Sequence, residues 1–277
     1  MKLPAAKPAS SSAWSAPRRG AFRIGSVSYL NAKPLIHGLE EQVDLDLRLD
    51  VPARLMDRLG TQEFDVALLP VIDYQRLANL KIVPSGGIGC DGPTLTVRIF
   101  SSCPISQIEI LACDMESHTS VALARIILAE SFGTRPEIVE LTGANEDESA
   151  SAARLLIGDK VVCQPSAGKY QLDLGAAWKE LTAMPFVFAV WTARGGIDLG
   201  DLPLRLSEAR LRGMDSLPEI VARHAVPRGW PAELAMEYMS KYLKYEIGPA
   251  QLAAIHRFHE LAHVHGIIPA PRPLQIY

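Results

Sequence analysis

The chain contains 277 residues, of which 48% are hydrophobic and 21% are charged. These proportions are typical of a globular protein and exclude a disordered chain, a collagen-like fibre and a coiled coil. The 28 basic and 31 acidic residues give a net charge of −3. A domain that holds a phosphate backbone is usually strongly basic, so nucleic acid is not expected as a partner. At about 150 residues per domain, the length corresponds to two domains or one large one.

The ends and cysteines of the chain also limit the function. No run of about 18 apolar residues occurs, so no membrane span is expected. Residues 1–21 are free of acidic residues and rich in Ala, Ser and Pro. They lack the apolar segment of a secretory signal, so we interpret them as a disordered extension outside the fold. The four cysteines are widely spaced, which indicates reduced, mostly buried thiols in a cytoplasmic protein.

The first half of the chain alternates apolar strand patterns with a helical pattern. Short apolar or β-branched runs predict strands, helical spacing that ends in Gly predicts a helix, and a segment with four Gly predicts a loop. The expected elements are a strand from 22 that ends in a loop at 28–31, a helix at 52–60, strands at 64–71 and 94–102, and the Gly-rich loop at 85–92.

The second half repeats this pattern and then becomes helical. The expected elements are strands at 108–114, 137–141 and 186–194, a helix at 116–133, a helix followed by a strand and turn at 151–162, and helices through most of 200–266. Such alternation predicts an α/β protein with mostly parallel sheets. Two α/β units joined by Gly-punctuated strands predict two lobes with a cleft at the carboxyl ends of the strands. The loop at 28–31, the Gly-rich segment and the helix start at 117–120 are therefore the cleft candidates.

The most conspicuous short motif is His259-Glu260-Leu261-Ala262-His263, an HExxH pattern. On a helix it would place two imidazoles on one face beside a general-base Glu, as in zinc metalloproteases. Position 269 is Pro where the extended motif needs a third His, and no Asp or Glu follows Glu260. We therefore favour an ordinary C-terminal helix with Leu252, Ile255, Phe258 and Ala262 inward and the His and Glu residues solvated, and we predict no metal site.

Other motifs are weaker. No GxGxxG opens a helix, and neither a phosphate-binding GxxxxGK[ST] nor a GxSxG is present. His37, His118 and His224 are isolated and are interpreted as surface or hydrogen-bonded histidines. Ser117, Thr119 and Ser120 open a predicted helix, where hydroxyls and free N–H groups could bind a carboxylate without a lysine. Simple capping of the helix explains the same residues equally well.

Several segments together resemble one enzyme family. They are RIGSVSYLNAKPL (23–35), FDVALLPVIDY (64–74), PSGGIGCDGPTLTVRIFSS (84–102), a D-x-x-S-x-T-S element (114–120), LLIGDKVV (155–162) and DLGAAWKELTAMPFVFAVWTAR (173–194). The combination is similar to the chorismate dehydratases of the futalosine route to menaquinone. The resemblance extends from residue 22 to about 268.

The resemblance implies a two-lobed, periplasmic-binding-protein-like (type II) α/β fold with a ligand cleft between the lobes and a helical C-terminal segment. We expect lobe 1 to comprise 22–102 plus 194–277, and lobe 2 to comprise 103–193. The implied reaction removes water from chorismate to give 3-[(1-carboxyvinyl)oxy]benzoate. Aromatisation of the ring drives this elimination, so no cofactor is expected. The implied partner is the small-molecule substrate, with the protein a monomer or homodimer.

The resemblance also places Asn31 in the catalytic pocket. Its amide could polarise the leaving hydroxyl or fix the base, which we hypothesise to be the substrate's own enolpyruvyl carboxylate or a residue not identified. A turn residue in left-handed conformation is the structural alternative for Asn31. The expected substrate-binding residues are Ser28, Tyr29, Gly87, Thr96, Ser117, Thr119 and Ser120.

A rival function on the same fold is a non-catalytic cytosolic binding protein or sensor for an aromatic carboxylate. Such a protein would leave chorismate unchanged, whereas an enzyme would turn it over. A metalloprotease is the third alternative, and it would require stoichiometric zinc.

Overall fold

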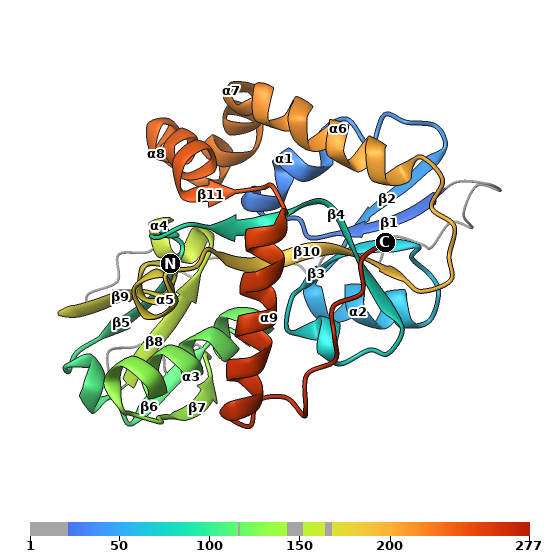
Figure 1. The fold of residues 1–277 in the computed structure, drawn as a ribbon. Coiled ribbons are helices and arrows are strands. Elements are labelled where there is room, and N and C mark those ends of the chain that lie inside the picture. The colour runs from blue at the N-terminus through green and yellow to red at the C-terminus, as the bar shows by residue number, and fades with distance from the viewer. Residues whose placement is uncertain (1–21, 116, 143–151, 164–167) are drawn as a thin grey trace.

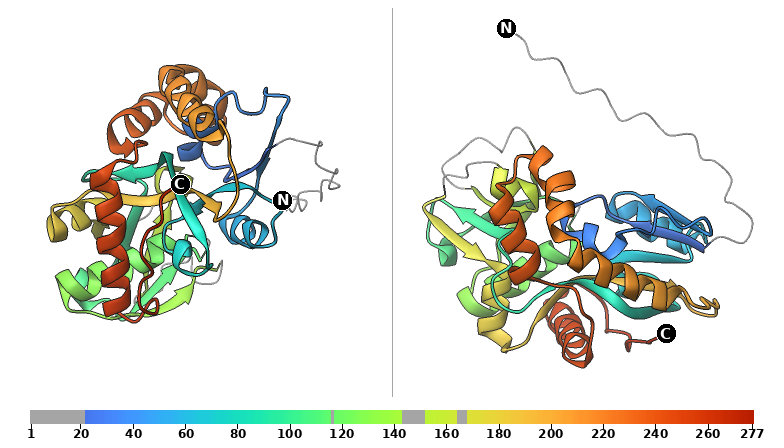
Figure 2. Two further views of the ribbon diagram at one scale, coloured as in Figure 1. Left: turned by 45° about the vertical axis from the view of Figure 1, so that its right-hand side comes forward. Right: turned by 90° about the horizontal axis from the view of Figure 1, so that it is seen from above.

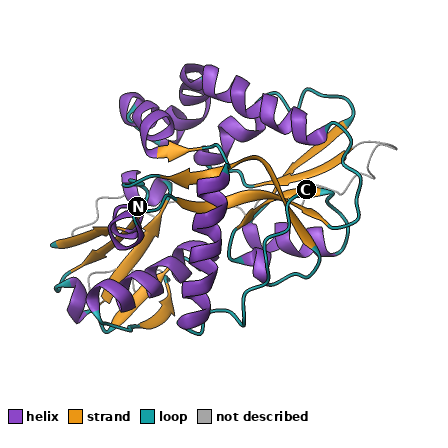
Figure 3. Ribbon diagram, viewed as in Figure 1, coloured by secondary structure: helices purple, strands orange, loops and turns teal. Residues whose placement is uncertain are grey.

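The computed structural model describes residues 22–115, 117–142, 152–163 and 168–277. The predicted disordered extension at 1–21 lies outside the described residues, as do position 116 of the predicted helix 116–133 and position 151 of the predicted helix at 151–162. The described chain forms two β-sheets with helices packed outside them (Figures 1 and 3). We call each sheet with its helices a lobe.

The first sheet has six strands in the order β11-β4-β10-β3-β1-β2. Strand β1 pairs in parallel with β2 and β3, whereas β10 runs antiparallel to β3 and β4 and β11 runs antiparallel to β4. The strands are β1 (Phe22–Ser26), β2 (Leu45–Leu49), β3 (Val66–Pro70), β4 (Leu80–Cys90), β10 (Phe186–Arg194) and β11 (Leu243–Lys244).

The second sheet has five strands in the order β7-β6-β8-β5-β9. Strand β6 pairs in parallel with β7 and β8, and β5 is antiparallel to β8 and β9. The strands are β5 (Val97–Ser101), β6 (Ile110–Cys113), β7 (Glu137–Glu140), β8 (Ala152–Ile157) and β9 (Tyr170–Asp173). Both sheets are therefore mixed, and the expectation of mostly parallel sheets is wrong. The strands that flank the two connections between the lobes, β4, β5 and β10, pair antiparallel with their neighbours.

The helices cover the sheets as the apolar spacing requires. Helix α2 has Pro at its first position and buries Leu55 and Leu59, and α3 ends at Gly133 in the left-handed conformation. Helix α6 packs against α1 and β4 on one side of the molecule (Figure 2). The helices are α1 (Lys33–Ile36), α2 (Pro52–Gly60), α3 (His118–Phe132), α4 (Asp159–Cys163), α5 (Leu174–Thr182), α6 (Leu202–Asp215), α7 (Leu217–Ile220), α8 (Ala232–Glu237) and α9 (Pro249–Val264).

Two predicted elements are wrong. The segment from 152 forms β8 and then helix α4, the reverse of the predicted order. Its Ala, Arg and Leu residues favour a helix, but pairing between β6 and β5 in the sheet overrides this propensity. The Gly-rich segment forms the end of β4 rather than a loop. A Cβ at Gly87 or Gly89 would lie 2.6 or 2.5 Å from a backbone oxygen of β10, so glycine is needed for this close strand approach.

The chain crosses between the lobes twice, at positions that differ from the expected boundaries. Strand β5, expected in lobe 1, belongs to the second sheet, and β10, expected in lobe 2, belongs to the first sheet. The first crossing is therefore the 91–96 segment and the second is 183–185. The first crossing joins β4 to β5 and the second joins α5 to β10. The sequence pattern of a strand does not reveal which sheet it joins.

One carboxylate holds the first crossing in place. The Asp173 side chain caps α5 by accepting from the N–H groups of Gly175 and Ala176, at 3.0 and 3.1 Å. The same carboxylate accepts from the N–H groups of Thr94 and Leu95, at 3.0 and 2.9 Å. Leu95 has a φ of 66°, so the chain turns sharply at this point. The cap of α5 and the shape of the crossing therefore depend on the same side chain.

Aromatic packing holds the second crossing. Trp178 of α5 donates its indole N–H to the carbonyl of Pro185 at 2.9 Å. The Trp178 ring meets Phe186 of β10 edge-on at 5.2 Å, and Phe186 meets Phe258 of α9 at 5.1 Å. Trp178, Phe186 and Phe258 are almost fully buried. This three-ring contact joins a lobe 2 helix to a lobe 1 strand.

Replacement of Asp173 should destabilise the fold. Asp173→Ala removes a helix cap, worth about 1 kcal/mol, and leaves the N–H groups of the first crossing unsatisfied, at about 1–3 kcal/mol. We expect a fall of about 2–4 kcal/mol in the free energy of unfolding, measured by urea denaturation. Asp173→Asn keeps one acceptor oxygen and should lose less. Equal stability of the Ala variant and the unsubstituted protein would contradict this role.

Helix α9, which carries the HExxH motif, contacts β10 of the first lobe and α3 of the second. Ile255, Phe258 and Ala262 are buried as predicted, but His259 is also buried, with 1% of its surface exposed. Its Nδ1 accepts from the amide of Gln75 at 2.9 Å, so its Nε2 carries the proton and donates to the carbonyl of Val71 at 2.8 Å. The prediction that the two motif histidines, His259 and His263, are solvated is therefore wrong for His259. Both of its ring nitrogens have protein partners.

Burial of neutral His259 should make stability depend on pH. Burial lowers its pKa to about 4 from an ordinary value of 6.5. The unfolded chain then binds a proton at a pH where the folded chain does not. The free energy of unfolding should therefore fall by about 3 kcal/mol from this residue as the pH drops from about 6.5 to about 4.

Chemical denaturation across this pH range measures the effect. In His259→Gln the free energy of unfolding should fall by about 3 kcal/mol less over this pH range than in the unsubstituted protein. Gln keeps one hydrogen-bond donor and one acceptor but does not titrate. The matched control is His256→Gln, on the exposed face of the same helix. If both variants keep the pH dependence of the unsubstituted protein, His259 is not the titrating group.

Candidate active site

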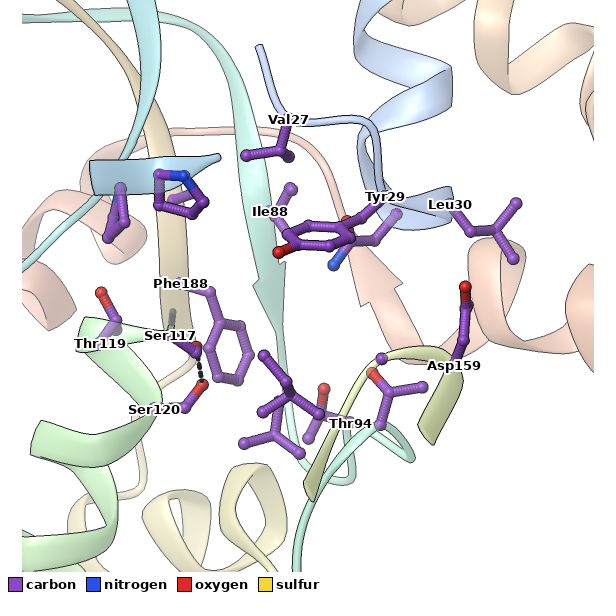
Figure 4. A pocket seen from close by; sticks show the side chains of 18 of the residues that line it. Val27, Tyr29, Leu30, Ile88, Thr94, Ser117, Thr119, Ser120, Asp159 and Phe188 are labelled. Atoms are coloured by element: carbon purple, nitrogen blue, oxygen red, sulfur yellow. Dashed lines mark hydrogen bonds between the residues drawn. The ribbon is translucent and has the colours of Figure 1, made fainter. Parts of the chain in front are cut away.

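A cavity of about 270 Å³ lies between the lobes, where the carboxyl ends of parallel strands from both sheets meet (Figure 4). The end of β3 and the segments after β1, β6 and β8 all contribute to it, as expected for a ligand site in an α/β fold. The lining includes Tyr29, Asn31, Ile88, Thr94, Thr96, Asp114, Ser117, Thr119, Ser120, Asp159, Lys160, Phe188, Tyr238 and Leu243.

The N-terminus of α3 forms one wall. Ser117, Thr119 and Ser120 line the cavity there, and the Ser117 hydroxyl donates to the Ser120 hydroxyl at 2.7 Å (Figure 4). The side chain of Ser117, the N-cap residue of α3, makes no capping hydrogen bond. The simple capping role that the sequence allowed equally well is therefore not seen for Ser117. Free N–H groups, hydroxyls and the positive end of the helix dipole together suit a carboxylate.

Asn31 forms part of the opposite wall, on the loop that follows β1. It lies in a short 3₁₀ turn, Leu30–Ala32, and its φ is not positive, so the left-handed alternative does not apply. Its Oδ1 is buried and has no hydrogen-bond partner among the described residues. A buried amide oxygen without a partner is costly, and a ligand in the cavity would relieve that cost.

Tyr238 places a phenol beside Asn31. Its hydroxyl is 2.8 Å from the hydroxyl of Thr96, in the first crossing. Burial raises the pKa of Tyr238 well above its ordinary value, against the lowering effects of hydrogen bonds with Thr96 and Asn31. The phenol is therefore protonated at neutral pH and remains a hydrogen-bond donor. Thr94 adds a buried hydroxyl that has no partner in the described chain.

The remaining walls are apolar and aromatic. Tyr29 and Phe188 lie on different sides of the cavity in Figure 4. Ile88 and Leu243 also belong to the apolar lining. The volume is just below the range of about 300–1,000 Å³ typical of small-molecule sites. A small ring with polar substituents matches this combination of flat apolar walls and localised polar groups.

The charged lining residues are already paired. Lys160 lies 2.7 Å from Asp114, and Asp159 accepts from the indole N–H of Trp230 at 2.7 Å. The guanidinium of Arg228 lies 3.7 Å from the other oxygen of Asp159. Because α4 belongs to lobe 2 and Trp230 to the helical part of lobe 1, Asp159 also joins the two lobes beside the cavity.

The structure brings together most of the predicted site residues. Tyr29, Asn31, Thr96, Ser117, Thr119 and Ser120 all line the one cavity. Ser28 is exposed and outside its lining, and Gly87 is paired with Val190 within the first sheet, with its N–H donating to Tyr245. Gly87 is buried by strand pairing, which the glycine pattern could not distinguish from a ligand loop.

Sequence reasoning missed several lining residues, namely Thr94, Asp114, Asp159, Lys160, Phe188 and Tyr238. All but Tyr238 lie within the segments that carry the family resemblance, so the signal was present but not assigned to the site. Tyr238 comes from a helical region without a motif. Among the described residues, no three His, Cys, Asp or Glu side chains gather as a metal site would require. No helix in the described ranges is long and apolar enough to cross a membrane.

Solved structures with similar folds confirm the two-lobed architecture. Protein AF1704 from Archaeoglobus fulgidus matches with a TM-score of 0.72 and 16% identity, over 91% of this chain and 100% of that one. The periplasmic aliphatic sulphonate-binding protein SsuA from Escherichia coli matches with a TM-score of 0.65 and 14% identity, over 94% of each chain. The fold is therefore periplasmic-binding-protein-like.

The sequence itself has closer relatives. A curated chorismate dehydratase from Thermus thermophilus is 29% identical, over 79% of this chain and 87% of the relative. A family model described as menaquinone biosynthesis matches residues 22–264. Because that match spans most of the chain and includes every strand of both sheets, the protein belongs to the menaquinone biosynthesis family.

Proposed function

We propose that this protein is a chorismate dehydratase, a carbon–oxygen lyase that removes water from chorismate to give 3-[(1-carboxyvinyl)oxy]benzoate. The observation that carries the proposal is the cavity between the lobes, which places the unpartnered amide oxygen of Asn31 opposite the hydroxyl-lined N-terminus of α3. Membership of the menaquinone biosynthesis family and the similarity to a chorismate dehydratase support the same reaction.

The N-terminus of α3 is assigned to the ring carboxylate of chorismate. Removal of the C3 proton sends negative charge through the ring double bond to this carboxylate, because the C3–H bond is vinylogously acidified. The hydroxyls of Ser117, Thr119 and Ser120 and the helix dipole would stabilise that charge as it develops. Lys160 is already neutralised by Asp114, so these groups carry most of the recognition of the anion.

Asn31 and Tyr238 are assigned to the reacting edge of the ring. The C4 hydroxyl leaves as water, and a donor near it lowers the barrier to breaking the C4–O bond. Protonated Tyr238 and the Asn31 amide both supply N–H or O–H donors on this side of the cavity. An amide is too weakly basic to take the C3 proton, so the substrate's enolpyruvyl carboxylate remains our proposed base. Tyr29 and Phe188 would hold the flat faces of the ring.

Incubation of the EDTA-treated protein with chorismate tests the reaction directly. Liquid chromatography with mass detection should reveal a product lighter by one water that keeps the enolpyruvyl group. Unchanged chorismate together with a raised melting temperature would instead indicate a binding protein. Absence of both turnover and binding would refute the proposal.

Truncation of the Asn31 side chain tests its catalytic role. Asn31→Ala should lower kcat about 10²–10³-fold, as expected for loss of one preorganised donor. The matched control is Ser28→Ala in the same loop, which should stay within about twofold because this exposed side chain lies outside the cavity lining. An unchanged kcat for Asn31→Ala would remove the residue from the mechanism.

A further inference from the structure

His118 lies in the first turn of α3, between the cavity-lining residues Ser117 and Thr119, but it does not line the cavity. The D-x-x-S-x-T-S element leaves this position unspecified. Its Nδ1 lies 2.8 and 3.0 Å from the two carboxylate oxygens of Asp73. Nη1 of Arg76 lies 3.1 Å from the same nitrogen and 3.1 Å from Asp73 Oδ1, so the guanidinium can donate to the carboxylate instead. A carboxylate only accepts hydrogen bonds, and its two oxygens surround Nδ1, so we assign the proton to Nδ1, which donates to Asp73. Of the two alternatives expected from sequence, a surface or a hydrogen-bonded histidine, the structure shows the second.

Asp73 belongs to the other lobe. It opens a 3₁₀ turn, Asp73–Gln75, that follows β3, and its side chain is completely buried, with 0% exposed. A buried carboxylate is tolerated only where it is well partnered. Besides His118, the guanidinium of Arg76 lies 3.1 Å from one oxygen of Asp73. The imidazole of His118 therefore supplies a lobe 2 partner to a buried lobe 1 carboxylate.

The chain neighbours of Asp73 and His118, Ile72 and Thr119, are also in contact. The N–H of Ile72 donates to the hydroxyl of Thr119 at 3.4 Å. Two consecutive residues after β3 thus contact two consecutive residues at the start of α3. These contacts fix the first turn of α3 relative to lobe 1, which carries Asn31. The hydroxyls of Ser117 and Ser120 then remain on the cavity side of the same turn.

We propose that Asp73 and His118 form an inter-lobe positioning pair, which holds the N-terminus of α3 in the orientation that binds the substrate carboxylate. The identity of that substrate rests on the proposed function. His118 does not touch the substrate and acts through the backbone of Thr119 and Ser120. Its loss should therefore weaken binding of the carboxylate much more than it slows the chemical step.

Steady-state kinetics with chorismate tests the pair. His118→Ala should raise KM at least tenfold and change kcat less than threefold. His118→Asn should restore KM to within threefold, because its amide nitrogen is attached to Cγ as the imidazole Nδ1 is and can donate to Asp73. The matched control is His265→Ala, which breaks a 2.7 Å histidine–carboxylate contact with Glu130 at the other end of α3. This control should leave KM within twofold.

Amide hydrogen exchange gives a readout that needs no substrate. In His118→Ala, exchange at 119–121 should be at least tenfold faster than in the unsubstituted protein, and in His265→Ala it should be unchanged there. If the unsubstituted protein does not turn over chorismate, the proposed function fails while the exchange measurement still decides the pairing. The pairing is overturned by unchanged exchange at 119–121 in His118→Ala. With an active protein, it is also overturned by an unchanged KM, or by a His118→Asn variant as impaired as His118→Ala.

Discussion

The Asp173 carboxylate joins the two parts of the chain on which the cleft depends. It ends β9, caps α5 and accepts hydrogen bonds from Thr94 and Leu95 in the first crossing. Helix α5 then leads directly into the second crossing, where Trp178 packs against Phe186. One side chain therefore couples the shape of both crossings. The position of Thr96, which meets Tyr238 inside the cavity, follows from that coupling.

The electrostatics of the cavity differ from those of a site built on surplus positive charge. Its lysine is paired with Asp114, and Asp159 is bonded to Trp230. Under the proposed function, recognition of the substrate carboxylate is left to hydroxyls and backbone N–H groups, whose hydrogen bonds are directional and weaken steeply with distance. We expect such a site to distinguish ligands by the position of their carboxylates. Its hydroxyl and N–H donors are fixed, whereas a flexible charged side chain could move to reach a carboxylate in another position.

The contacts around helix α9 decide what the histidines of the HExxH motif do. Residues four apart share a helix face, so the spacing of His259 and His263 is compatible with joint metal binding. In the folded chain Gln75 and Val71 occupy both ring nitrogens of His259, while His263 is exposed. Helix α9 packs against both lobes, and His259 provides a polar contact between this helix and the core. The motif is accounted for by packing.

The residues themselves determined the α/β class, most strands, helix α2 and the family. Apolar periodicity, Gly and Pro stops and the signature segments are local, so they survive without knowledge of the fold. Only the tertiary structure decided which sheet β5 and β10 join, because the pattern of a strand does not record its partner strands. It also decided that the Gly-rich segment is a paired strand, that 152–157 is a strand despite its helix-forming residues, and that His118 meets Asp73. These outcomes depend on contacts between residues distant in the chain, such as the 45 positions that separate Asp73 from His118.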